Sequence, residues 1–224
     1  ARSGRWQPLA DQAAVIRARE RRQGAAALWQ GRADWRVIPT APDGWAPQSP
    51  TGWLIEDTLT ARLHPRAGGR ALVAAIRARG GAVVEGVAKP ESRSAVIWAT
   101  GVAGLADLSA DLGKTVGTGI KGQAALFRCD ARDRPQIFAD GVHVVPHHDG
   151  TVAVGSTSEQ AFDAGAVTDG QLDALIERAR ALCPMLRAAE VVERWAGVRP
   201  RGSSRAPMLG RWPGRARSIS ASSC

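Results

Sequence analysis

Four short segments between residues 122 and 155 constrain the fold of this chain more than any other feature of its sequence. Each is rich in β-favouring residues, and turn residues separate them. The segments are Gly122–Phe127, Gln136–Phe138, Val142–Val145 and Thr151–Gly155. His147-His148-Asp149-Gly150 is typical of a hairpin turn. Strands joined by short turns run antiparallel, so this part of the chain predicts an antiparallel sheet.

A helix and a further strand follow this sheet. Thr168 and Gln171 have capping-box spacing, which predicts that Thr168 begins the helix. The expected apolar stripe comprises Leu172, Leu175, Ile176, Ala179 and Leu182, and Pro184 is expected to end the helix. Residues 191–199 then read as a strand that Pro200 ends, with Arg199 as its last residue.

The first half of the chain has a different sequence pattern, with fewer predicted strands and more predicted helix and irregular structure. Residues 9–29 predict an amphipathic helix, and the prolines and tryptophans of residues 35–52 predict irregular structure packed on a surface.

Residues 70–79 predict a helix that Gly80 and Gly81 end. Residues 82–87 read as a strand. The apolar run 95–101 predicts a strand covered on both faces, as in an α/β nucleotide-binding layer. The fold class is therefore α+β.

Composition narrows the functional classes. The net charge of +9 is carried almost wholly by arginine spread along the chain, whereas nucleic-acid binding needs a clustered basic face with aromatic platforms. The local cluster of Arg17, Arg19, Arg21 and Arg22 is interpreted as a solvated helix face. Three scattered cysteines and no membrane-length apolar run predict a cytoplasmic protein without a membrane span.

Two motif matches are rejected. Gly117-Thr-Gly-Ile-Lys-Gly122 fits the dinucleotide expression G-x-G-x-x-G, but it runs into an expected strand instead of opening a helix. His143, His147 and His148 could suggest a metal site. Adjacent turn residues do not easily converge on one ion, so no metal is expected.

Arg199 is the strongest candidate binding residue that the pattern offers. A guanidinium on a rigid strand matches a carboxylate in bidentate fashion. The alternative interpretation is one more solvated arginine in an arginine-rich chain.

The ordered motifs resemble one known family. They are Ala99-Thr-Gly101, Lys121-Gly-Gln123, His143-Val-Val-Pro146, Asp149-Gly150, Val154-Gly-Ser-Thr157, Phe162-Asp163, Trp195-Ala-Gly-Val-Arg-Pro200 and Pro207-Met-Leu-Gly210. Their order and spacing resemble the D-amino-acid oxidase and glycine oxidase family of FAD-dependent enzymes. The likeness runs from about Glu56 to Gly210.

The resemblance implies a function and a set of site residues. The family oxidises the CH–NH bond of a small amino acid or amine, and FAD takes the hydride. By this resemblance Arg199 holds the substrate carboxylate, and His143 stands where the family often has a substrate-facing tyrosine. Thr100 and Gly101 lie along the FAD, and Val87 lies near its adenine end. Residues 1–115 would then be the remainder of the FAD-binding domain, and residues 116–224 an antiparallel-sheet substrate domain; the two can interleave.

The chain also departs from the family. The opening strand and G-x-G-x-x-G turn that hold the FAD pyrophosphate are absent from this sequence, and residues 215–224 lack strand or helix periodicity. We therefore expect an incomplete enzyme. The alternative is a non-catalytic remnant or a small-carboxylate-binding module without FAD. The sequence leaves the substrate, the electron acceptor and the oligomeric state open.

Overall fold

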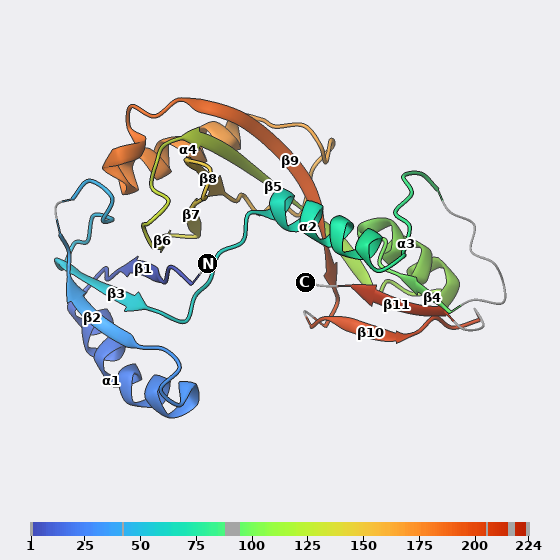
Figure 1. The fold of residues 1–224 in the computed structure, drawn as a ribbon, viewed down its shortest axis with the longest axis horizontal. Helices are drawn as coiled ribbons and strands as arrows, with labels where there is room; N and C mark the ends of the chain where they lie inside the picture. The colour runs from blue at the N-terminus through green and yellow to red at the C-terminus, as the bar shows by residue number, and fades with distance from the viewer. Residues whose placement is uncertain (1, 42, 88–94, 205, 215–217, 223–224) are drawn as a thin grey trace. The chain divides into compact units, whose positions relative to one another are not determined.

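The computed structural model describes residues 2–41, 43–87, 95–204, 206–214 and 218–222. The helices are α1 (Gln12–Trp29), α2 (Pro65–Ala78), α3 (Gly101–Leu112) and α4 (Gly170–Leu182), with a 3-10 turn at Pro184–Leu186. The strands are β1 (Arg5–Pro8), β2 (Trp35–Pro39), β3 (Trp53–Asp57), β4 (Val96–Trp98), β5 (Gly117–Arg128), β6 (Gln136–Ala139), β7 (Val142–Pro146), β8 (Thr151–Gly155), β9 (Val191–Gly202), β10 (Met208–Arg211) and β11 (Ser218–Ser222). The expected α+β class is confirmed (Figure 1).

Among the described residues, the largest sheet has eight strands in the order β2-β3-β1-β6-β7-β8-β5-β9. The predicted hairpin is present, because β7 and β8 pair antiparallel and place Val144 opposite Val154. β6 also pairs antiparallel with β7. The rejection of the dinucleotide motif is confirmed, because Gly117 to Gly122 lie inside β5 and open no helix.

Helix α4 covers one face of this sheet through its predicted stripe. Leu172, Leu175, Ile176 and Ala179 are buried against Phe127 and other core residues of the strands. The helix begins one residue later than predicted, because Asp169, not Thr168, accepts the hydrogen bond from the backbone N–H of Gln171. A carboxylate at this position also interacts favourably with the helix dipole.

A second cluster holds α1 against β2 and β3, and Figure 1 shows the helix beside these strands. Val15 and Ala18 are buried there, whereas the four arginines of the local cluster are exposed, which confirms the solvated-face interpretation. Trp35 to Pro39 form a strand, so the irregular stretch is shorter than expected. Within the described part of residues 40–52 there is no helix or strand, and Trp45 is completely buried.

The chain forms two compact units that alternate along the sequence. The first comprises residues 1–81, 123–157 and 168–195; the second comprises residues 82–122, 158–167 and 196–224. The described residues of the second unit contain a three-stranded sheet in the order β10-β11-β4, in which β11 runs parallel to β4 and antiparallel to β10. Trp212 is buried in this unit and donates to Asp111 Oδ2 at 2.7 Å. The domain boundary expected near residue 115 stays a prediction.

Two strand predictions in this unit are wrong. Residues 82–87 form no strand, and Val84 and Val87 are exposed, because β propensity needs a hydrogen-bonded neighbour to produce a strand. Strand β4 is not covered on both faces, since Ile97 is 68% exposed. In the tail, whose sequence lacks periodicity, the described segment Ser218–Ser222 forms the central strand of the small sheet, where backbone hydrogen bonds substitute for side-chain periodicity.

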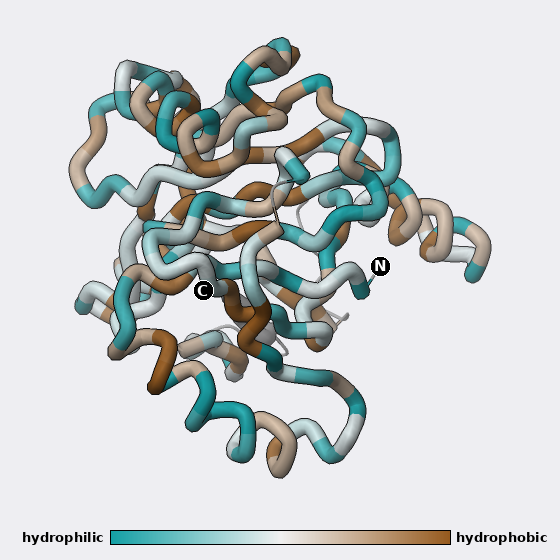
Figure 2. The backbone as a smooth tube through the Cα atoms, turned by 90° about the vertical axis from the view of Figure 1, so that its left-hand side faces the viewer, coloured by the Kyte–Doolittle hydropathy of each residue, from teal (hydrophilic) through white to brown (hydrophobic). Residues whose placement is uncertain are grey.

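None of the described helices is long and apolar enough to cross a membrane, and the hydrophobic segments in Figure 2 are short and interrupted. Cys129 and Cys183 are free thiols, and burial raises the pKa of Cys183 to about 12. Cys224 lies outside the described residues.

Candidate functional site

Arg199 lies within β9 and not at its end. The strand continues through Pro200 to Gly202, so the expected stop at this proline is wrong. β9 is the last strand of the large sheet, and an edge strand tolerates a residue that cannot donate a hydrogen bond on its open side. The Arg199 side chain is exposed, and its Nη2 lies 3.4 Å from Ser158 Oγ.

Two neighbouring arginines were expected to be more exposed than Arg199. Arg201 is instead partly buried, so this prediction is wrong for it. Arg205 lies outside the described residues. Arg199 is therefore more accessible than Arg201, the arginine two residues further along β9.

The residue before Arg199 is held by close packing in the second unit. A Cβ added to Gly119 would lie 2.5 Å from Val198 Cγ1 and 3.4 Å from Val102 Cγ1, and one added to Gly165 would lie 2.4 Å from Val198 Cγ2. The ring of Phe162 borders both glycines. These contacts place β5, β9 and the start of α3 against one another. They restrict the backbone from which Arg199 projects, because packed cores resist displacement.

A buried ion pair fixes the segment that carries Ser158. Lys121 Nζ lies 3.4 Å from Glu159 Oε2, and both side chains are about as buried as core residues, at 4% and 5% exposure. The backbones of the two residues also exchange a pair of hydrogen bonds, each 2.9 Å long. The ion pair and the two-residue bridge therefore hold Ser158 beside Arg199.

Gln123 holds both flanks of the same segment from within the first unit. Its side chain is completely buried, donates to Asp169 Oδ1 at 2.8 Å and accepts from the Asp169 backbone N–H at 2.8 Å. Its backbone N–H donates to Thr157 Oγ1 at 2.8 Å. Through its side chain and its backbone N–H, this one residue ties β5 to the residues on either side of positions 158–167.

Replacing Gln123 by leucine is expected to lower the free energy of unfolding by about 2–3 kcal/mol, because the change leaves the Asp169 carboxylate and N–H without these partners. Urea unfolding would measure it. Gln23→Leu, at an exposed position of α1, is the matched control and should change stability by less than about 0.5 kcal/mol. Equal stability of the two variants would contradict the structural role of Gln123.

Thr100 and Gly101 lie where β4 passes into α3. Gly101 has a φ of 62°, which a glycine adopts without strain, and no atom lies within 4 Å of the Cβ that it lacks. Thr100 is the N-cap residue of α3, and its side chain lies over Gly104. Because β4 runs parallel to β11, this is the carboxyl edge of a parallel strand pair, which is where α/β folds bind ligands.

His143 lies in β7 of the first unit. Its ring packs on Phe138 with centroids 4.5 Å apart. Loss of water around the imidazole, and next the positive charge of Arg5, lower its pKa below the ordinary value. The ring is therefore neutral at pH 7 and can donate or accept a hydrogen bond.

The structure thus places Arg199, Thr100, Gly101 and Val87 in the second unit and His143 in the first. The side chain of Val87 is fully exposed. Sequence reasoning missed Ser158 and the Lys121–Glu159 ion pair. It also missed the hydrogen bonds that Gln123 makes with Asp169 and Thr157. A signal was present in the polar residues Lys121 and Gln123 within an otherwise β-favouring run, since polar residues in a buried strand need partners.

Comparison with known proteins gives a consistent result. The profile of the family described as "DAO: FAD dependent oxidoreductase" matches residues 2–219. Glycine oxidase of Pseudomonas putida is 38% identical over 112 residues, which make up 47% of this chain and 31% of that protein. The matched region therefore spans about a third of this curated relative.

Solved structures share the fold. Glycine oxidase from Geobacillus kaustophilus has a TM-score of 0.72 at 20% identity, with 100% of this chain and 65% of that chain covered. Iminodiacetate oxidase from Chelativorans sp. has a TM-score of 0.75 at 19% identity, with 99% of this chain and 66% of that chain covered.

Proposed function

This chain belongs to the DAO family of FAD-dependent oxidoreductases, and from that premise we propose that it provides the substrate-binding part, and some of the cofactor-binding part, of a flavoenzyme. The enzyme oxidises the CH–NH bond of a small amine or of an amino acid of the glycine or D-amino-acid type. The observation that carries this proposal is an accessible Arg199 on a strand whose backbone is packed against neighbours on both sides of Val198.

Arg199 binds the substrate carboxylate in this proposal. Its guanidinium offers parallel N–H donors that match two carboxylate oxygens. Ser158 Oγ lies beside the same group and limits its rotation. Fixing the carboxylate orients the neighbouring carbon, so that its C–H bond is presented in one direction.

The neutral His143 is the second substrate-binding residue that we propose. An uncharged imidazole can accept a hydrogen bond from a substrate amine or donate one to a carboxylate. It adds no positive charge to repel an ammonium group, because its pKa is lowered.

The residues present fit part of an FAD site. The start of α3 is accessible at Gly101, and aliphatic side chains of the same unit are exposed to solvent. Ile97 and Val87 are 68% and 100% exposed. Thr100 and Gly101 would face the cofactor through the N-terminus of α3, and Val87 would contact its adenine end. When bound, FAD accepts the hydride that the substrate carbon loses.

A small-carboxylate-binding module without FAD is the second candidate. It is favoured by the position of the G-x-G-x-x-G sequence, which lies inside β5 and cannot cradle a pyrophosphate. Arg199 would then bind a carboxylate without subsequent chemistry.

Residues 1–224 by themselves are expected to hold FAD weakly, because this sequence contains no glycine-rich turn leading into a helix for the pyrophosphate. The measurement is flavin absorbance of the purified chain after added FAD and gel filtration. A yellow, stoichiometrically loaded preparation would refute the expectation.

The function itself is tested by anaerobic flavin bleaching. The FAD-saturated protein, expressed with any flanking sequence of its reading frame, is mixed in turn with glycine, sarcosine and D-alanine. Reduction of the flavin by at least one of them is expected. Binding of these compounds without reduction would favour the module over the enzyme.

A further inference from the structure

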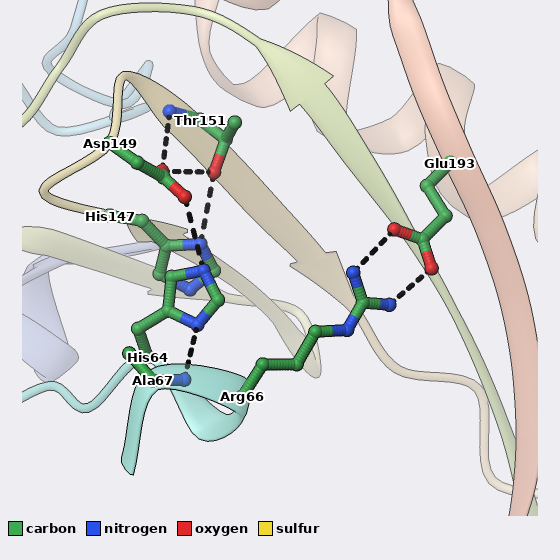
Figure 3. A network of polar contacts seen from close by, with 7 residues as sticks. All are labelled: His64, Arg66, Ala67, His147, Asp149, Thr151 and Glu193. Carbon is green, nitrogen blue, oxygen red and sulfur yellow. Dashed lines mark hydrogen bonds and ion pairs between the residues drawn. The ribbon is translucent and has the colours of Figure 1, made fainter. Parts of the chain in front are cut away.

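Two histidines that are far apart in the sequence lie together in the first unit. His64 is the N-cap residue of α2, and His147 begins the turn of the β7–β8 hairpin. Their ring centroids are 4.3 Å apart, and Figure 3 shows the rings side by side. Asp149, from the same turn, accepts at Oδ2 from His64 Nε2, 3.1 Å away.

Further hydrogen bonds fix the orientation of the Asp149 and His147 side chains. Thr151 Oγ1 donates to Asp149 Oδ1 at 2.7 Å, which leaves its lone pairs to accept from His147 Nδ1 at 3.1 Å (Figure 3). His147 then carries its proton on Nδ1, and its Nε2 presents a lone pair. A ring held at one nitrogen by an oxygen acceptor is the usual state of a metal-binding histidine.

The charge states are also those that a metal ion requires. Burial is the largest cause that lowers the pKa of His147, and the neighbouring His64 adds to it, so His147 is neutral at pH 7. Hydrogen bonding from Thr151 lowers the pKa of Asp149, which is therefore ionised. Arg62 and His148 also face this group.

We propose that His64, His147 and Asp149 bind a divalent transition-metal ion of the zinc class. One ligand atom from each residue lies within 4.8 Å of the others. Two imidazoles and a carboxylate suit Zn²⁺, Ni²⁺ or Cu²⁺ better than Mg²⁺, which prefers oxygen ligands. A cavity of about 390 Å³, lined in part by His64 and His147, leaves room for water as a further ligand.

Binding requires a small rearrangement. Ligand atoms around a zinc ion with bonds of about 2.0–2.1 Å lie closer than 4.8 Å, so side-chain rotation must draw the ligands together by about an ångström. The ion replaces the proton on His64 Nε2. His64 Nδ1 then carries a proton and releases the backbone N–H of Ala67, whose hydrogen bond is long at 3.4 Å.

This set differs from the three histidines considered from the sequence. His147 is common to both sets, but His143 lies in the strand before the turn, and His148 meets His64 only edge-on, with centroids 5.8 Å apart. The argument against adjacent turn residues still applies to His147 and His148. His64 could not be found from the sequence, because the fold alone brings it to the hairpin.

The ion would tie the start of α2 to the hairpin. Arg66, in the first turn of the same helix, already pairs with Glu193 of β9, with Nη1 donating to Oε2 at 2.7 Å (Figure 3). A metal at His64 adds a second attachment of α2 within this unit. It does not involve Arg199 or flavin, so the proposed function can fail without affecting it.

Isothermal titration of the chain with Zn²⁺ at pH 7.5 is expected to give one site with a dissociation constant on the order of 1–10 µM. Ni²⁺ should compete for it, and Mg²⁺ should not. His64→Asn and His147→Asn are each expected to weaken binding about a hundredfold. Asparagine is a good N-cap residue, so His64→Asn removes the ligand while keeping the helix cap.

His143→Asn is the matched control and should leave Zn²⁺ affinity within about twofold of wild type. Thermal unfolding in EDTA identifies any variant that has lost its fold. Absence of saturable Zn²⁺ binding by the folded wild type would overturn the proposal. It would also be overturned if folded His64→Asn and His147→Asn bound Zn²⁺ as tightly as the control.

Discussion

Arg199→Lys, in the flavin-loaded enzyme, is expected to raise the half-saturation concentration for an amino-acid substrate about thirty- to a hundredfold. Lysine keeps the positive charge but loses the planar fork that binds two carboxylate oxygens. A charge-assisted pair of this kind contributes on the order of 2–3 kcal/mol, which corresponds to that factor. FAD affinity should change little, because Arg199 is not among the residues proposed to contact the cofactor. Steady-state oxidation at varied substrate concentration provides the measurement.

Two comparisons make this test specific. Arg201→Lys alters the neighbouring, partly buried arginine of the same strand and should leave the half-saturation concentration almost unchanged. An amine substrate without a carboxylate should be oxidised alike by wild type and Arg199→Lys. If the variant lost affinity equally for both kinds of substrate, Arg199 would not be the carboxylate-binding residue.

Lys121→Met is expected to destabilise the protein by about 3–5 kcal/mol, because it leaves Glu159 buried without the cation that lies 3.4 Å from it. The loss should appear in the second unit, to which both Lys121 and Glu159 belong. Urea unfolding measures the change, and hydrogen exchange of the backbone amides of the second unit locates it.

Removing both charges distinguishes an ion pair from simple packing. The double variant Lys121→Met with Glu159→Leu should recover most of the lost stability, since an apolar pair of similar volume often matches a buried ion pair. Lys114→Met, at an exposed position, is the control and should be nearly neutral. A double variant as unstable as the sum of its single variants would show that the charges do not interact.

Local signals predicted much of the fold. The β7–β8 hairpin follows from its turn residues, and the stripe of α4 follows from helical periodicity, because both depend on residues close in sequence. The end of α2 near Gly80 was predicted for the same reason, since Gly80 has a φ of 81°. Neighbouring residues carry enough information when a structure is stabilised locally.

Predictions failed where distant pairing decides the outcome. Residues 82–87 have β propensity but form no strand, whereas the serine-rich segment of β11 has little propensity and forms one between β4 and β10. Pro200 continues a strand because β9 lies at a sheet edge. Sequence periodicity does not specify which strand lies beside which.

The residues of the candidate site also fall into two groups, those that the sequence identifies and those that only the fold brings together. Arg199 could be selected from its motif, because guanidinium chemistry is visible in the sequence. Ser158, Glu159 and His64 could not, since each acquires its partner through a contact between distant segments. The roles of Arg199, His143, Val87, Thr100 and Gly101 stay predictions.

The position of β11 has a consequence for the order in which this protein is made. β4 pairs with β11, and 120 residues separate Trp98 from Ser218 along the chain. At a synthesis rate of about 5–20 residues per second, β11 is synthesised about 6–24 seconds after β4. During that interval Val96, Ile97 and Trp98 present an apolar strand edge, which is the kind of segment that chaperones bind. Within the described residues, the small sheet is therefore completed late in synthesis, long after its earliest strand has been made.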